Sequence, residues 1–234
     1  MQETTQLAFV LHTRPYRENQ VLIDFLTENE GKVAALSYVG HSTKSSRKAL
    51  LQPFLPINIT LKGQHVLRNL TRVEPAGKSI LLTKTALFSA FYINELLVKL
   101  LPENTPCIDL FQQYFTSLHA LLNKEEIEIT LRQCELVLLA ELGISFDFSL
   151  VFEHTASSFY YLPEDGFLPA YTALKQPCYD RLHLQAIANE NFSNSEVLAT
   201  FKMLMRQVIT HLLAGVPLNS RKLFSKNKVD VKSL

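Results

Sequence analysis

Apolar and polar residues alternate with a period close to two over the first seventy-five residues, which predicts a series of short β-strands. The segments rich in β-branched and aromatic residues, separated by polar turns, cover residues 7–13, 20–26, 32–39, 50–61 and 65–74. Pro53 and Pro56 fall near the start of the fourth segment, where a bulge or a sheet edge tolerates them. Five short strands in so short a stretch predict a small closed barrel of the OB-fold type.

After Pro75 the apolar residues recur at i, i+3, i+4 and i+7, as they do in helices. This pattern predicts helices over residues 83–101, 106–122, 127–142, 179–189, 193–214 and 219–224, and a hairpin in 145–172 that turns at Pro163–Gly166. Ser193 is the expected N-cap of the longest helix, with Glu196 completing a capping box. The fold class is therefore α+β: a five-stranded OB-fold barrel over residues 1–78, then an α-helical domain over 79–234.

The densest apolar run, residues 86–101, contains Asn94, Glu95 and Lys99. It is shorter than the roughly 20 apolar residues of a membrane span, so we expect a buried helix and no membrane association. The three cysteines, Cys107, Cys134 and Cys178, match no zinc motif, and their odd number favours reduced thiols in the cytoplasm.

No phosphate-binding glycine loop, nucleophile elbow or HExxH motif occurs, and the seven histidines are scattered. The chain is therefore predicted not to be an enzyme, and no cofactor is expected.

The net charge of +1 conceals a strong segregation along the chain. Residues 1–75 hold nine Lys or Arg and six Asp or Glu (+3), residues 76–200 hold seven and fifteen (−8), and residues 201–234 hold seven and one (+6). Cationic surfaces on a small barrel are typical of proteins that hold a nucleic-acid backbone, because they displace the counterions of the phosphates. The alternative is that these charges belong to solvated faces.

The candidate DNA-binding residues are cations in the barrel segment and near the C-terminus: Arg14, Arg17, Lys44, Arg47, Lys48, Arg68, Arg72, Arg221 and Lys222. Arg14 and Arg17 flank Tyr16 at the first turn, where an arginine could instead pair with Glu18. Arg68 and Arg72 are spaced to share one face of a strand. Arg221 and Lys222 have two open interpretations, contact with DNA or closure of the domain.

Five segments resemble the RecO family of DNA repair proteins in its enterobacterial-type form, in order from about Ala8 to Phe224. They are AFVLHTRPYRENQVLIDFLTENEGKV, LLQPFLP, YINELLVKLLPE, LRQCELVLLAELG and GVPLNSRKLF. The resemblance implies an OB-fold followed by a helical domain. It also implies a recombination mediator that binds single- and double-stranded DNA, anneals complementary strands, docks on the acidic tail of the single-stranded-DNA-binding protein and, with RecR, helps load RecA. RecF is a further candidate partner, and we expect a monomer in the nucleoid-associated cytoplasm.

Two departures from the family pattern bear on these expectations. Many relatives carry a four-cysteine zinc module where Ile144–Tyr171 has no cysteine, so no zinc is expected here. The loop after Gly40, strongly basic in relatives, is reduced to the cations Lys44, Arg47 and Lys48.

Arg132 lies among apolar residues of the segment LRQCELVLLAELG. Because the family's tail-docking site lies on this domain, we expect Arg132 to bind an acidic partner or its terminal carboxylate. The alternative is a pair with Glu128 or Glu135 along the helix. At the level of function, the alternatives are an adaptor with little direct DNA binding and an RNA-binding OB-fold protein.

Overall fold

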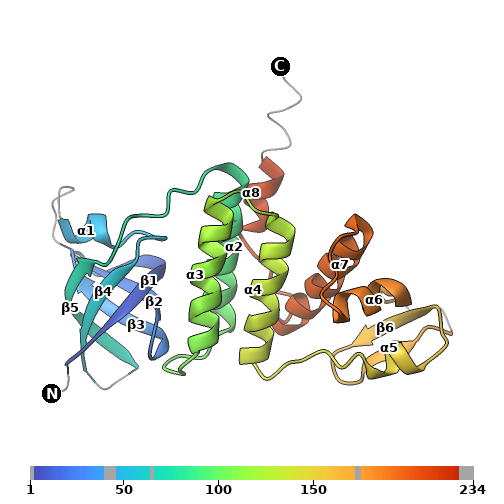
Figure 1. The fold of residues 1–234 in the computed structure, drawn as a ribbon. Coiled ribbons are helices and arrows are strands. Elements are labelled where there is room, and N and C mark those ends of the chain that lie inside the picture. The colour runs from blue at the N-terminus through green and yellow to red at the C-terminus, as the bar shows by residue number, and fades with distance from the viewer. Residues whose placement is uncertain (1–2, 40–45, 64–65, 172–174, 227–234) are drawn as a thin grey trace. The chain divides into compact units, whose positions relative to one another are not determined.

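The computed structural model describes residues 3–39, 46–63, 66–171 and 175–226 (Figure 1). The chain forms two compact units. We call Met1–Ile127 together with Leu218–Leu234 the barrel unit, and Glu128–Pro217 the second unit. Residues 218–226 thus belong with the first half, so the second unit interrupts the barrel unit in the sequence.

The barrel unit contains the expected closed five-stranded barrel. Its strands are β1 (Glu3–Tyr16), β2 (Gln20–Thr27), β3 (Gly31–Tyr38), β4 (Ile57–Lys62) and β5 (Leu67–Pro75), in the order β1-β2-β3-β5-β4. Neighbouring strands are antiparallel except β3 and β5, which are parallel. The interior is filled by buried aliphatic and aromatic side chains, among them Val10, Ile23, Phe25, Val33, Ile59 and Leu70. The prediction of an α+β fold that begins with an OB-type barrel is confirmed.

The predicted fourth strand is partly wrong, because it begins at Ile57 and not at residue 50. A short helix, α1 (Ser46–Leu50), precedes it. The prolines explain the difference: Pro53 and Pro56 cannot donate ladder hydrogen bonds, so a regular strand starts only after them.

Helices α2 (Lys84–Leu100), α3 (Ile108–Leu122) and α8 (Arg221–Lys226) complete the barrel unit. Phe9 of β1 is fully buried, and its ring centroid lies 5.9 Å from that of Phe111 and 5.2 Å from that of Tyr114. Tyr92, Phe111 and Tyr114 are likewise buried, whereas Phe115 is 37% exposed.

A β-bulge in β1 prepares the contact with α2. The register shifts between Val10 and His12, which releases the Leu11 carbonyl from the ladder. That carbonyl accepts a hydrogen bond of 3.0 Å from Asn94 Nδ2, and Tyr114 donates to Asn94 Oδ1 at 2.8 Å. The buried Asn94 amide is thus bonded on both sides and fixes α2 and α3 against β1.

The far end of α2 is held by β3. Lys32 is 8% exposed, and its Nζ donates to the Val98 carbonyl at 2.9 Å near the C-terminus of α2, where a cation is favourable. Burial lowers the pKa of Lys32 below its ordinary 10.5, with Glu103 and Asp24 opposing the shift. The segment after α2 returns along β3, where Asn104 N donates to the Lys32 carbonyl at 2.8 Å.

The second unit contains α4 (Ile127–Glu141), whose first residue belongs to the barrel unit, then α5 (Ser149–Glu153), α6 (Arg181–Ala188) and α7 (Ser195–Leu212). A three-stranded sheet of order β7-β6-β8 is formed by β6 (Ser158–Leu162), β7 (Gly166–Pro169) and β8 (Cys178–Asp180). The predicted hairpin is therefore present, while α5 and β8 were not expected. The predicted N-cap of α7 is wrong: Asn194, not Ser193, accepts from Glu196 N, and Ser193 Oγ donates to Asn191 instead.

Aromatic rings gather in the segment 146–167, which contains no cysteine. The ring centroid of Phe146 lies 5.3 Å from that of Tyr161 and 6.0 Å from that of Phe167. The rings of Phe148 and Phe167 are stacked, with their centroids 5.0 Å apart. In the described residues, no group of three His, Cys, Asp or Glu side chains is placed to hold a metal ion. No helix in the described ranges is long and apolar enough to cross a membrane.

Candidate nucleic-acid interface

The turn between β1 and β2 presents two of the candidate cations. Arg14 has a side chain that is 53% exposed and lies 3.9 Å from Asp24, not beside Glu18. Arg17 is exposed at the turn, with a left-handed φ of 52°, and its guanidinium lies 5.3 Å from the centroid of the Tyr16 ring. This cation–π contact holds Arg17 at the hairpin tip while leaving its donors in solvent.

Asp24 accounts for the two basic side chains beside it on β1, His12 and Arg14. Its side chain is only 6% exposed and lies 3.9 Å from both His12 Nδ1 and Arg14 Nη2. A buried carboxylate requires nearby positive charge. At 3.9 Å these pairs are loose, so Arg14 keeps donors for a ligand.

The helix α1 presents two more cations. Arg47 Nη2 donates to the Thr71 carbonyl of β5 at 2.7 Å, which attaches α1 to the barrel, whereas Lys48 is exposed. Lys44 lies outside the described residues. Arg47 therefore has a structural contact, and Lys48 is the candidate of this segment that faces solvent.

The strand register relates the hairpin to α1. Arg14, Leu22, Leu36 and Asn69 are successive partners across β1, β2, β3 and β5. Three strand spacings separate Arg14 from β5, about 14 Å across the curved sheet. Because β5 runs parallel to β3, Thr71 lies beyond Asn69 in the direction of the hairpin tip. We name Arg14, Arg17, Arg47 and Lys48 the cationic edge.

Arg68 and Arg72 do not share a face. The register of β5 against β4 shifts between Thr60 and Leu61, so a bulge interrupts the alternation on which that prediction depended. The Arg68 side chain is 13% exposed and binds Glu30 at 2.5 Å and Asn104 Oδ1 at 3.0 Å. The Arg72 side chain is 71% exposed and binds Glu74 Oε1 at 2.8 Å. Acids therefore already balance both charges.

The candidates near the C-terminus lie on α8. Lys222 is exposed, and its Nζ lies 3.4 Å from Asn219 Oδ1; Arg221 is half-buried. They are positioned by the contact of the preceding residues with α2. Glu95 accepts hydrogen bonds from Asn219 N at 2.9 Å and from Ser220 N and Oγ at 2.8 and 2.6 Å.

Arg132 of α4 is buried, at 4% exposure, and is paired with Glu135 at 2.8 Å. This is one of the two intrahelical pairs considered from the sequence; Glu128 binds Lys202 at 2.6 Å instead. Arg132 Nε is buried without a hydrogen-bond partner in the described part of the chain. The Nε–H of Arg132 is thus still available as a donor, but the side chain is almost fully covered.

Two polar groups important to this region were missed from the sequence. Asp24 is the lone acid in the apolar segment QVLIDFLT, and Lys32 opens an apolar strand. A charged residue inside an apolar run is the signal that could have identified them, because such a residue needs a specific partner.

Comparison with known proteins covers both halves of the chain. The family model described as Recombination protein O N terminal matches residues 1–78, and that described as Recombination protein O C terminal matches residues 83–222. A protein of Tolumonas auensis named DNA repair protein RecO is 39% identical over 93% of this chain and 93% of its own length. Proteins of the same name from Actinobacillus succinogenes (35%; 98% and 99%) and Haemophilus influenzae (36%; 97% and 98%) are similar over nearly their full lengths.

Proposed function

The chain belongs to the RecO family, and from this membership we propose that it is a mediator of recombination in DNA repair. In this role it binds single- and double-stranded DNA, anneals complementary strands and, together with RecR, helps load RecA. The role contains no catalytic step. A cytoplasmic, nucleoid-associated location and a partnership with RecF remain predictions.

The observation that carries the DNA-binding part is the cationic edge. Arg14, Arg17 and Lys48 are solvent-exposed on a closed barrel of a type that other proteins use to bind oligonucleotides. Their spacing is within the length of a few nucleotides, and Tyr16 adds an aromatic ring beside Arg17 on which a base can stack. Such contacts are electrostatic and carry little sequence preference.

We propose that Arg132 receives the acidic tail of the single-stranded-DNA-binding protein. The support is its unbonded Nε and the apolar character of α4 around it. Because Arg132 is buried and paired with Glu135, docking requires a local opening in which a tail carboxylate joins or replaces Glu135. The tail would therefore bind slowly compared with binding to an open site.

The test is annealing of complementary oligonucleotides coated with the single-stranded-DNA-binding protein, with or without its last residues. We expect faster annealing that depends on the tail. The variant Arg17→Glu/Lys48→Glu should lose this acceleration, whereas the matched variant Arg206→Glu, an exposed arginine of α7, should retain it. Unchanged annealing by the double variant would contradict the proposed DNA interface.

The alternative is an adaptor with little direct DNA binding, and one observation favours it: Arg68 and Arg72 already have acidic partners. Direct titration of a fluorescent oligonucleotide separates the two functions. A mediator loses about 0.7 decades of affinity per decade of salt for each single-strand phosphate it neutralises. An adaptor shows weak binding that the charge reversals leave unchanged, and an RNA strand of the same sequence tests for ribose preference.

A further inference from the structure

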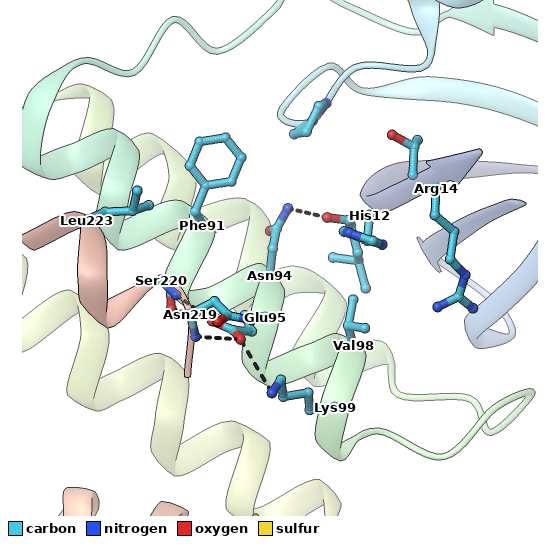
Figure 2. Close-up of a pocket in the computed structure, with 13 residues that line it drawn as sticks. His12, Arg14, Phe91, Asn94, Glu95, Val98, Lys99, Asn219, Ser220 and Leu223 are labelled. Carbon is cyan, nitrogen blue, oxygen red and sulfur yellow. Dashed lines mark hydrogen bonds and ion pairs between the residues drawn. The ribbon is translucent and has the colours of Figure 1, made fainter. Parts of the chain in front are cut away.

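The barrel unit contains a pocket that shares Arg14 alone with the cationic edge and does not include Arg132 (Figure 2). Its volume is about 620 Å³, within the range of roughly 300–1,000 Å³ of ligand sites. Three segments far apart in the sequence line it, residues 11–14 of β1, residues 91–99 of α2 and residues 219–223, with Pro53 as a further wall. The pocket therefore exists only when the end of the chain has returned to α2.

One end of the pocket is apolar. Phe91 and Leu223 lie together on the side away from Arg14 (Figure 2), and Leu11, Pro53 and Val98 continue the apolar lining. Asn94 cannot act as a polar anchor for a ligand, because Leu11 and Tyr114 already use its amide groups. Binding at this end thus depends on burial of apolar surface.

The other end carries basic side chains. The side chains of His12 and Arg14 are 54% and 53% exposed and that of Lys99 is 26% exposed. Two carboxylates lie nearby: the Asp24 side chain is 6% exposed, and that of Glu95, at 14%, accepts hydrogen bonds from Asn219 and Ser220 and pairs with Lys99 at 3.5 Å. A ligand at the mouth therefore meets the guanidinium of Arg14, the ammonium of Lys99 and the imidazole of His12, and the Glu95 carboxylate is already engaged by three hydrogen bonds and by Lys99.

We propose that this pocket binds an acidic protein segment, with a large apolar side chain between Phe91 and Leu223 and carboxylates at His12, Arg14 and Lys99. A nucleotide fits the lining less well. Base recognition uses an open aromatic face, and the one aromatic residue of the apolar end, Phe91, packs against Phe54 at 5.2 Å. The site lies in the barrel unit and is independent of the docking proposed at Arg132.

The test is fluorescence anisotropy with a labelled heptapeptide of four glutamates around a central phenylalanine, titrated with the full-length protein. We expect saturable binding that Val98→Glu weakens at least tenfold, because it places a carboxylate in the apolar lining. Lys99→Gln, which leaves that lining intact, should weaken binding about fivefold. Lys78→Glu, an exposed cation outside the pocket, should bind like the unmodified protein.

Two control peptides separate the contribution of the carboxylates from that of the apolar side chain. Replacing the glutamates by glutamine should abolish the effect of Lys99→Gln, and replacing phenylalanine by serine should abolish binding. The proposal is overturned if the peptide binds Val98→Glu and Lys99→Gln normally while both variants melt like the unmodified protein. It is equally overturned if Arg132→Met abolishes the binding, or if fifteen-residue oligothymidine displaces the peptide and loses its own affinity in Val98→Glu.

Discussion

Glu95 and Ser220 are 125 positions apart in the sequence, yet the Glu95 carboxylate accepts both the backbone N–H and the hydroxyl of Ser220. With the further bond from Asn219 N, this one side chain attaches the end of the chain to α2. The contact lies within the barrel unit and joins residues on either side of the second unit in the sequence. It also forms one wall of the pocket in Figure 2.

Glu95→Gln should destabilise the barrel unit by about 2 kcal/mol at neutral pH, because a charged acceptor of three hydrogen bonds is lost. Burial raises the pKa of Glu95, but the bonds from Ser220 and Asn219 and the charge of Lys99 outweigh it, so the pKa lies below its ordinary 4.5. A lowered pKa stabilises the fold above pH 4.5, and this stabilisation is lost as the pH falls through the folded value.

Urea unfolding at several pH values measures this effect. The difference between the unmodified protein and Glu95→Gln should be full at neutral pH and should narrow below pH 4.5. Ser220→Ala should show a smaller loss of the same kind, and Glu125→Gln, an exposed residue, should show none. A difference that stays constant down to strongly acidic pH would contradict the role of the Glu95 charge.

Gly31→Ala should be strongly destabilising. A Cβ at Gly31 would lie 1.9 Å from the Thr105 carbonyl oxygen, and the residue has a φ of +68°. Gly143→Ala is the matched control, since Gly143 has a φ of +73° and no atom within 4 Å of its would-be Cβ. Thermal unfolding should show that the control lowers the free energy of unfolding by about 1 kcal/mol, from backbone strain alone. The loss of unfolding free energy for Gly31→Ala should be several-fold larger than that of the control. Equal losses would mean that the segment after α2, which contains Thr105, moves aside at little cost.

Arg132 and Glu135 form a buried ion pair, and removing one partner should destabilise the protein more than replacing both. Arg132→Ala leaves the Glu135 carboxylate buried without its cation and should cost about 3–5 kcal/mol. Replacing both residues by leucine should cost clearly less, because no isolated charge remains. A double-mutant cycle by urea unfolding measures the coupling. If the tail of the single-stranded-DNA-binding protein docks here, the stable double variant should lose tail binding.

Arg17 should contribute to DNA binding, whereas Arg68 should contribute to the stability of the fold. Arg68→Ala removes a largely buried pair with Glu30 and should lower the free energy of unfolding by about 1–3 kcal/mol, with DNA affinity of the folded protein unchanged. Arg17→Ala should lower DNA affinity and the salt slope while leaving stability within about 0.5 kcal/mol. Calorimetry and oligonucleotide titration on both variants test this; the reverse pattern would move the interface to β5.

The sequence alone predicts the class of the elements well, because period and turn chemistry are local. The alternation over residues 1–75 produces a barrel, and the helical periodicity of 83–101 and 106–122 produces α2 and α3 within one or two residues. It fails for α1 and α5, five-residue helices too short to show a period. The N-cap of α7 was misplaced by one residue because Asn194 and Ser193 are both good capping residues.

The tertiary structure decides which charged side chains can still bind a ligand. Positive charge in the barrel segment is visible in the sequence, but the bulge in β5 separates Arg68 from Arg72, and Glu30 and Glu74 occupy them. Burial and pairing of Arg132 likewise depend on how α4 is packed. The sequence by itself therefore determined the family, the barrel and the sign of the charge, since these follow from local pattern. The pocket and the Glu95–Ser220 contact depend on residues more than a hundred positions apart, and only the folded chain brings them together.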